Sequence, residues 1–135
     1  VNSSPHAHLD LGNFELEAGG VRWAKDLGSD DYNLDGYWTM GVNGKRWSYY
    51  RLNSFSHNVP LLGNKNQYEL AKARFIQKEL NVVNPFATLD LTEAYKEFSS
   101  KSTRKNSLVD QRKNVIISNP SQSLLVDISL VLPCN

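Results

Sequence analysis

The sequence has almost no cysteine and almost no excess of one charge over the other. Cys134 is the only cysteine among 135 residues, so no internal disulfide can stabilise the fold. The 15 lysines and arginines nearly balance the 14 aspartates and glutamates. This balance lacks the strongly positive field that nucleic-acid binding requires, and no nucleic-acid partner is expected.

Long apolar runs are also missing. No stretch approaches the roughly 18 consecutive apolar residues of a membrane-spanning helix, so membrane insertion is not expected. The sequence contains no internal repeat and no low-complexity segment. A chain of 135 residues is long enough to bury a core, and we expect a single domain over residues 1–135.

The clearest structural signal is a pair of glycines between two alternating stretches. Residues 13–18 place apolar and acidic side chains on opposite sides, and residues 21–26 follow directly after Gly19-Gly20. This pattern predicts a β-hairpin, because both central positions of its tight turn favour positive φ. The expected cross-strand pairs are Ala18 with Val21, Glu17 with Arg22, and Leu16 with Trp23.

Short apolar stretches separated by turn-forming residues make up most of the remaining chain. Further strands are expected over residues 46–52, 68–77, 87–91 and 124–132, with a second hairpin over residues 108–118. One helical turn is expected at residues 92–95, and turns are expected at residues 63–66 and 101–106. Many short strands with few helices predict an all-β fold, an antiparallel β-sandwich with at most one or two short helical turns.

The three histidines carry the most distinctive chemical signal. His6 and His8 are two positions apart, and this spacing puts two imidazoles on one face of an extended strand. Asp26 follows His8 by 18 positions, and His57 follows Asp26 by 31 positions. Two imidazoles and one carboxylate are a suitable zinc set, with a fourth position left for water or another ligand. By spacing alone, however, incidental histidines are the commoner interpretation.

Three longer stretches add a family resemblance. They read P-H-A-H-L-D-L-G-N-F at residues 5–14, R-W-A-K-D-L-G-S-D-D-Y at residues 22–32, and R-W-S-Y-Y-R-L-N-S-F-S-H-N at residues 46–58. In order and spacing they resemble the C-terminal domain of the heparinase II/III-like polysaccharide lyases, a family that includes oligoalginate lyases. The likeness runs from about Ser4 to about Asn119.

The resemblance implies both a fold and a set of roles. In that family an N-terminal α/α toroid packs on a C-terminal β-sandwich, and the active site lies between them. The resemblance implies zinc ligation by His8, Asp26 and His57, and a catalytic position for His6 at the cleft. The implied reaction is β-elimination at a uronic acid, which makes an acidic polysaccharide or oligosaccharide the expected partner. A periplasmic or secreted location is implied in the same way.

The main acid–base groups of such an enzyme belong to the toroid, which has no counterpart in these residues. We therefore expect a fragment of a longer lyase that has little or no activity alone. Tyr50 and Arg51 are candidate substrate-binding residues, because tyrosine can donate a proton and arginine can pair with a uronate carboxylate. A sandwich that stops early would also expose a strand edge, which favours self-association.

Two other interpretations stay open. The chain is alternatively a carbohydrate-binding β-sandwich with a structural metal. Its sugar-stacking platforms would then be the aromatic residues Tyr32, Tyr37, Trp38 and Trp47. A third interpretation is a structural β-domain whose histidines have no chemical role. Replacement of His6 separates the first two, since only a lyase needs this residue at the cleft.

Overall fold

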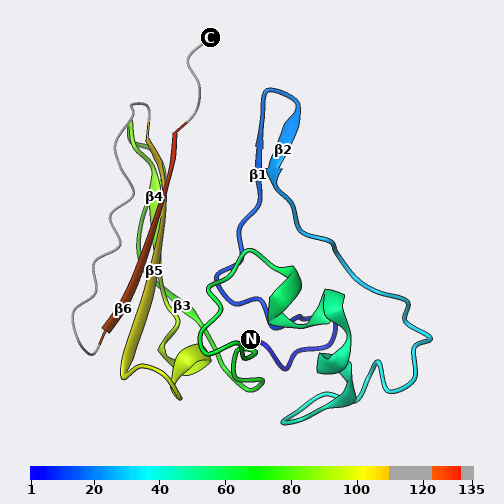
Figure 1. Cartoon of the computed structure of the whole chain (residues 1–135). Coiled ribbons are helices and arrows are strands. Elements are labelled where there is room, and N and C mark those ends of the chain that lie inside the picture. Colours follow the sequence, from blue (N-terminus) through cyan, green and yellow to red (C-terminus); the bar gives the residue numbers. More distant parts are fainter. Residues whose placement is uncertain (110–122, 132–135) are drawn as a thin grey trace.

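The computed structural model of the chain describes residues 1–109 and 123–131 (Figure 1). Within these ranges the all-β prediction is confirmed, because the only helical elements are 3-10 turns of three or four residues. The strands are β1 (Leu16–Ala18), β2 (Val21–Ala24), β3 (Arg74–Glu79), β4 (Phe86–Asp90), β5 (Lys101–Val109) and β6 (Ser123–Val131). The 3-10 turns are η1 (Lys45–Ser48), η2 (Tyr50–Leu52), η3 (Ser54–Ser56) and η4 (Thr92–Tyr95). None of these helical turns in the described ranges has the length and apolar character needed to cross a membrane.

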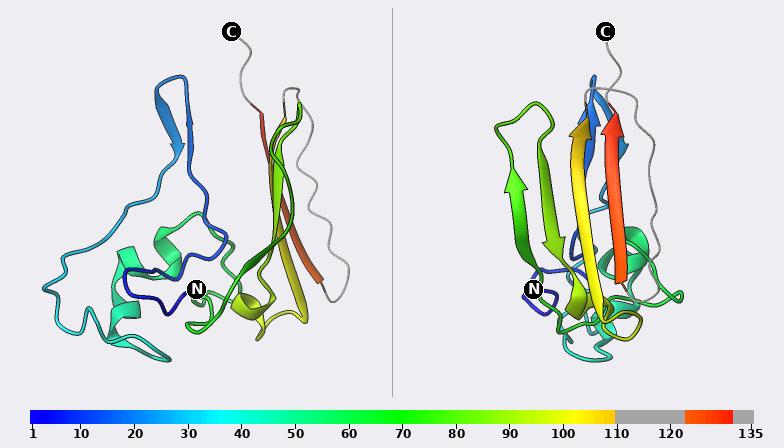
Figure 2. Two further views of the ribbon diagram at one scale, coloured as in Figure 1. Left: turned by 180° about the vertical axis from the view of Figure 1, so that it is seen from behind. Right: turned by 90° about the vertical axis from the view of Figure 1, so that its left-hand side faces the viewer.

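The strands form two sheets. β1 and β2 make a hairpin, and the larger sheet has the order β3-β4-β5-β6. β3, β4 and β5 pair antiparallel, as predicted, whereas β6 lies parallel to β5. Figure 2 shows the hairpin beside one face of the larger sheet. A cleft of about 330 Å³ lies between them, lined from β1 and from β4 and β5, so the two sheets form separate layers.

The hairpin follows the predicted register at its turn and departs from it further along. Gly19 and Gly20 have φ values of 59° and 73°, and the Ala18–Val21 and Glu17–Arg22 pairs are present. Leu16 pairs with Ala24 rather than with Trp23, because the register shifts at a bulge between Leu16 and Glu17. Trp23 consequently has no cross-strand pairing partner in the hairpin register. This residue is 64% exposed.

The predicted strand over residues 46–52 is wrong. η1 and η2 occupy this stretch, and the neighbouring residues Arg46 and Trp47 are both buried. A strand would send these two side chains to opposite faces, so it could not bury them together against one core. The Arg46 guanidinium instead donates to the carbonyl oxygens of Ala7 and Tyr37, at 2.9 and 3.0 Å.

The predicted turn at residues 101–106 is also wrong, because this basic stretch forms most of β5. Ser102 and Arg104 are each 1% exposed and alternate with more accessible neighbours, which is the burial period of a strand. The Arg104 Nη1 donates to the carbonyl oxygen of Asn58 at 2.6 Å, and its guanidinium lies over the Phe14 ring. Charged residues in a pattern that looks solvated can therefore be buried where distant acceptors meet them.

Several other expectations are confirmed by their elements. β4 and β6 coincide within one residue with the strands expected at residues 87–91 and 124–132. η4 is the predicted helical turn, and a turn closes around residues 63–66. The strand expected over residues 68–77 begins only at Arg74. Most of the second hairpin, at residues 110–118, lies outside the described residues.

The apolar core sits where the loop region meets the larger sheet. Ala71, Leu91, Ala94 and Tyr95 form a buried cluster, against which partly buried apolar residues from both regions pack. Outside this cluster the buried residues are both apolar, such as Leu9 and Leu52, and polar, such as Arg46 and Gln67. The contacts of the polar residues position the candidate site.

Candidate metal centre

His57 is the most deeply buried residue of the candidate site. It ends η3, and its side chain is 0% exposed. Nδ1 of its imidazole lies 2.6 Å from Oδ2 of Asp26. Nε2 is also buried but has no hydrogen-bond partner among the described residues. A buried ring nitrogen without a partner is unfavourable unless a ligand meets it, so this atom marks the site.

Asp26 is fixed from three directions. Its Oδ1 accepts from the backbone N–H of Gly28 at 2.7 Å, and its Oδ2 accepts from Nδ2 of Asn13 at 2.8 Å as well as contacting His57. Partial burial alone would raise the pKa of Asp26, but these hydrogen bonds outweigh it and lower the pKa. Asp26 is therefore a carboxylate that holds the His57 ring in one orientation.

Asn13 and Asn58 extend this arrangement. Oδ1 of Asn13 accepts from the backbone N–H of Asn58 at 2.9 Å, while its Nδ2 contacts Asp26. Nδ2 of Asn58 in turn donates to the carbonyl oxygen of Phe14 at 2.9 Å. The residue that follows His57 is thus tied to the segment that leads into β1.

His8 faces the same point as His57. The two ring centroids are 5.1 Å apart and the rings are inclined by 36°. Burial, followed by the positive charges of His57 and Arg46, lowers the pKa of His8 from 6.5 to about 4. His8 is therefore neutral at pH 7, which is the form of imidazole that binds a metal ion.

Asp10 completes the donor group, and our sequence analysis missed it. His8, Asp10 and His57 each present a ligand atom, and these atoms lie within 4.8 Å of one another. Burial is the main reason that the pKa of Asp10 is raised. The two positions between His8 and Asp10 were not a usable signal, because this spacing places side chains on one face only in an extended strand, and residues 6–10 do not form one.

His6 does not join this group. Residues 6–8 are not a strand, and His6 has a φ of 66°, so the argument from extended-strand geometry fails here. The His6 ring instead lies 5.3 Å from the Trp38 ring and 5.7 Å from the Tyr32 ring, measured between centroids. The two histidines of the pair therefore occupy different environments, one among metal-binding donors and one among aromatic residues.

Tyr50 and Arg51 lie in η2, outside both environments. Nη1 of Arg51 donates to the carbonyl oxygens of Leu27 and Ser29, at 2.6 and 3.4 Å, and so braces the loop that follows Asp26. Tyr50 is 58% exposed. The structure brings neither residue into the donor group of His8, Asp10 and His57.

The donors present suit a metal ion. Imidazole nitrogens and carboxylate oxygens are ligands for zinc, His8 is in the neutral form that ligation requires, and Nε2 of His57 has no competing hydrogen-bond partner among the described residues. Fold and site together define an all-β domain with a candidate metal centre.

The family follows from a comparison with known proteins. The family model described as "Heparinase II/III-like, C-terminal" matches residues 1–128. The chain belongs to this family, and it is a polysaccharide lyase domain of the C-terminal type. No curated protein matches the chain.

Proposed function

We propose that this chain is the zinc-binding β-domain of a lyase that cleaves uronic-acid-containing polysaccharides by β-elimination outside the cytoplasm. Two observations support the proposal: the family match over residues 1–128, and the donor group of His8, Asp10 and His57, in which Nε2 of His57 is the ring nitrogen without a hydrogen-bond partner among the described residues. The donor group is the observation that carries it, because a neutral imidazole, a buried imidazole and a carboxylate converge there.

His8 and His57 are the two imidazole ligands of the proposed site. Asp26 is the third ligand on the strength of the resemblance. Asp10 is the alternative carboxylate, because its oxygen lies in the described donor group while Asp26 already contacts Nδ1 of His57. In that second arrangement Asp26 orients the imidazole, as carboxylates behind metal-bound histidines commonly do.

Zinc would supply positive charge and a fixed geometry in the wall of the cleft. His6 is proposed to face substrate beside Trp38, where its ring is not engaged in the donor group. In β-elimination a base removes the proton from the carbon next to the uronate carboxylate. The negative charge of that carboxylate opposes this step and must be neutralised. We also propose that Tyr50 and Arg51 bind a uronate carboxylate. Arg51 would first have to break its hydrogen bonds to the backbone carbonyl oxygens of Leu27 and Ser29.

The main acid–base groups are proposed to come from an α/α toroid that these residues do not contain. The chain is therefore expected to be inactive alone, and its partners are the toroid and an acidic polysaccharide. An assay for unsaturated product, with the 135-residue chain and an alginate or heparan oligosaccharide, tests this point. Measurable product from the chain alone would contradict it.

Elemental analysis of the purified protein tests the metal site. We expect about one zinc per chain, lost in His8→Ala and in His57→Ala but retained in His6→Ala, which removes a histidine outside the donor group. Equal loss in all three variants would point to unfolding or to adventitious binding. No zinc in the unmodified protein at saturating metal would overturn the proposal.

The carboxylate ligand is identified by comparing Asp10→Asn with Asp26→Asn. Loss of a ligand should abolish stoichiometric binding, whereas loss of an orienting carboxylate weakens metal affinity by about 10–100-fold. The variant with the larger effect identifies the ligand. Cobalt substitution gives a second readout, because its visible spectrum changes with the coordinating atoms.

A carbohydrate-binding module with a structural metal is the second candidate. Tyr32 and Trp38, each 46% exposed, support it as stacking platforms. Tyr37 and Trp47 do not, because they are buried with exposed fractions of 1% and 5%. Under this alternative Trp38→Ala would abolish oligosaccharide binding and His6→Ala would leave it unchanged.

A further inference from the structure

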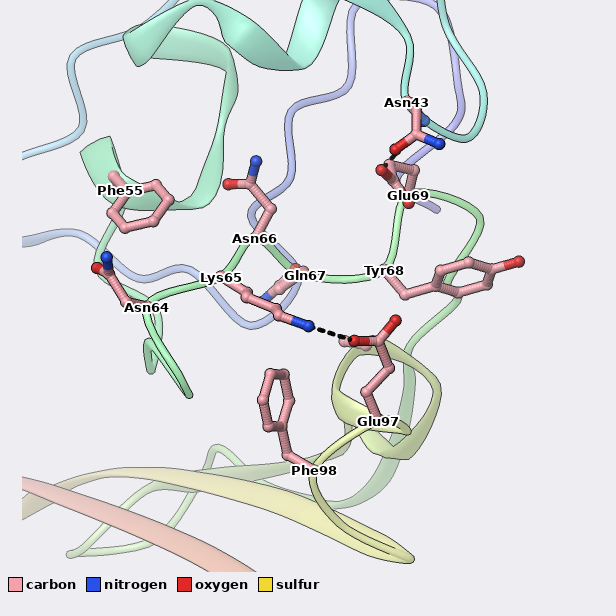
Figure 3. A pocket seen from close by; sticks show the side chains of 11 residues that line it. Asn43, Phe55, Asn64, Lys65, Asn66, Gln67, Tyr68, Glu69, Glu97 and Phe98 are labelled. Carbon is pink, nitrogen blue, oxygen red and sulfur yellow. Dashed lines mark hydrogen bonds and ion pairs between the residues drawn. The ribbon is translucent and has the colours of Figure 1, made fainter.

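A second hollow is lined by neither the donor group nor the aromatic residues around His6. Its volume is about 390 Å³, within the range of roughly 300–1,000 Å³ that small-molecule sites occupy. Figure 3 shows its walls, which come from segments distant in sequence: η3, the turn after Gly63, and the residues after η4. It shares no residue with the proposed metal site.

Two asparagines at this pocket adopt backbone conformations that normally favour glycine. Asn43 has a φ of 59° and Asn64 a φ of 53°. Asparagine tolerates these values better than most other residues with a side chain, and at both positions it also places an amide group at the pocket. Among the described residues neither side-chain amide has a hydrogen-bond partner, and each can both donate and accept.

Both aromatic and amide side chains line the pocket. Phe98 is 43% exposed and packs against Gly63, which has no Cβ to displace the ring. Phe55 lies across the pocket from it in Figure 3. Flat apolar rings together with free amides suit a ligand that has both C–H faces and hydroxyl groups. A sugar residue has this combination.

The charges of the lining favour a neutral ligand over an anionic one. The Lys65 ammonium is 3.3 Å from a carboxylate oxygen of Glu97 and so is already paired. Oε1 of Glu69 accepts from the backbone N–H of Asn43. Two carboxylates against one paired ammonium leave the lining net negative, which disfavours a uronate.

From these observations we propose that this pocket is an accessory site for a neutral, hydroxyl-rich sugar residue. It is separate from the uronate chemistry proposed around His6 and goes beyond that function. An accessory site of this kind retains a polysaccharide chain on the β-domain while another part of the same chain occupies the cleft.

The site is tested by two-dimensional NMR of the full ¹⁵N-labelled chain in the presence of zinc. The probes are neutral β-1,4-linked trisaccharides of glucose, mannose and xylose, at up to about 20 mM, which detects a millimolar dissociation constant. At least one probe should shift the side-chain amide signals of Asn43 and Asn64. If none of the three shifts them, the proposal is overturned.

Variants separate this site from general surface binding. Asn64→Gly keeps the backbone conformation and removes the amide, and Phe98→Leu keeps apolar contact with Gly63 but removes the ring. Each should weaken binding by about five- to tenfold, since each removes one favourable contact. Asn81→Gly, in the exposed β3–β4 connection, should leave the affinity unchanged. Equal weakening in all three would overturn the proposal.

An acidic probe and the metal content complete the test. A mannuronate trisaccharide should leave the Asn43 and Asn64 signals unshifted, and a shift larger than that of the neutral probes would overturn the choice of a neutral ligand. Zinc content, measured on the same samples, reports on the metal site alone. Failure of the sugar site and failure of the metal site are therefore separate results.

Discussion

The part of the chain before β3 and the four-stranded sheet are stabilised in different ways. Before β3 regular structure is sparse, and buried polar side chains such as Arg46 and Gln67 bridge segments far apart in sequence. In the sheet the strands are held by a regular ladder, yet all six residues of β3 are exposed. The candidate site therefore depends on a few specific polar contacts, whereas the sheet depends on repeated backbone pairing.

Gln67 shows how specific these contacts are. Its side chain is buried, and its amide donates to the Leu11 carbonyl and to the Tyr95 hydroxyl, each at 2.9 Å. The same amide accepts from the Leu11 backbone N–H at 2.8 Å. One side chain thus joins the segment that carries His8 and Asp10 to the apolar core.

The largest effect is expected from the buried arginine. Arg46→Met should lower the free energy of unfolding by about 3 kcal/mol or more, because it leaves the Ala7 and Tyr37 carbonyls without their donor. Urea denaturation measures the change. Arg74→Met is the matched control in the sheet, where the Arg74 side chain is 82% exposed, and should change stability by about 0.5 kcal/mol or less. Similar losses in both variants would contradict the comparison.

Removal of metal should affect the two regions unequally. All three tryptophans precede β3, at positions 23, 38 and 47, so tryptophan emission reports only the region of the site. If zinc is present at about 100 times its dissociation constant, chelation removes about 2.7 kcal/mol of stabilisation. We expect chelation to lower the midpoint of the emission transition while slow hydrogen exchange persists at β4 and β5. Simultaneous loss of both signals would show one cooperative unit instead.

The exposed face of β3 is expected to influence association more than stability. Ile76 is the unpaired residue of a bulge in this edge strand and is 54% exposed. Ile76→Lys should change the free energy of unfolding by about 0.5 kcal/mol or less and should reduce self-association. Sedimentation velocity measures this, with Lys78→Gln as a control on the same strand. If self-association is unchanged in Ile76→Lys, β3 is not the interface.

The smallest expected effect is the pH dependence contributed by Asp90. Hydrogen bonds from the Thr92 side chain and backbone, together with Arg74, lower the pKa of Asp90. A lowered carboxyl pKa stabilises the fold above the unfolded value of about 3.9, and this stabilisation is lost as pH falls through the folded value. Asp90→Asn should therefore flatten the acid side of the stability curve below about pH 4. An unchanged curve would mean that Asp90 contributes nothing.

The sequence predicts what local chemistry decides. Gly19-Gly20 determines the hairpin, and the apolar stretch before η4 determines β4, because each signal lies within its own element. These features need no knowledge of distant residues.

The remaining features depend on contacts across the chain. Arg46 and Arg104 look like solvated charges until carbonyl oxygens from Ala7 and Asn58 meet them. The contact between Asp26 and His57 joins residues 31 positions apart, which resemblance indicated but periodicity could not. The pocket at Asn64 likewise assembles from separate segments, none of which carries a local signal for it.

The parallel pairing of β6 with β5 has a consequence for the order of folding. Antiparallel neighbours can form as each strand arrives, but a parallel neighbour requires a crossover, for which residues 110–122 are available. The connection between β5 and β6 must be closed, at a cost in chain entropy, before the two strands can pair. β6 is therefore expected to join the sheet last. During synthesis the ladder from β3 to β5 can close before β6 leaves the ribosome, and until then β5 is an open edge. The arrival of β6 thus covers the β5 edge and ends the period in which that edge is exposed.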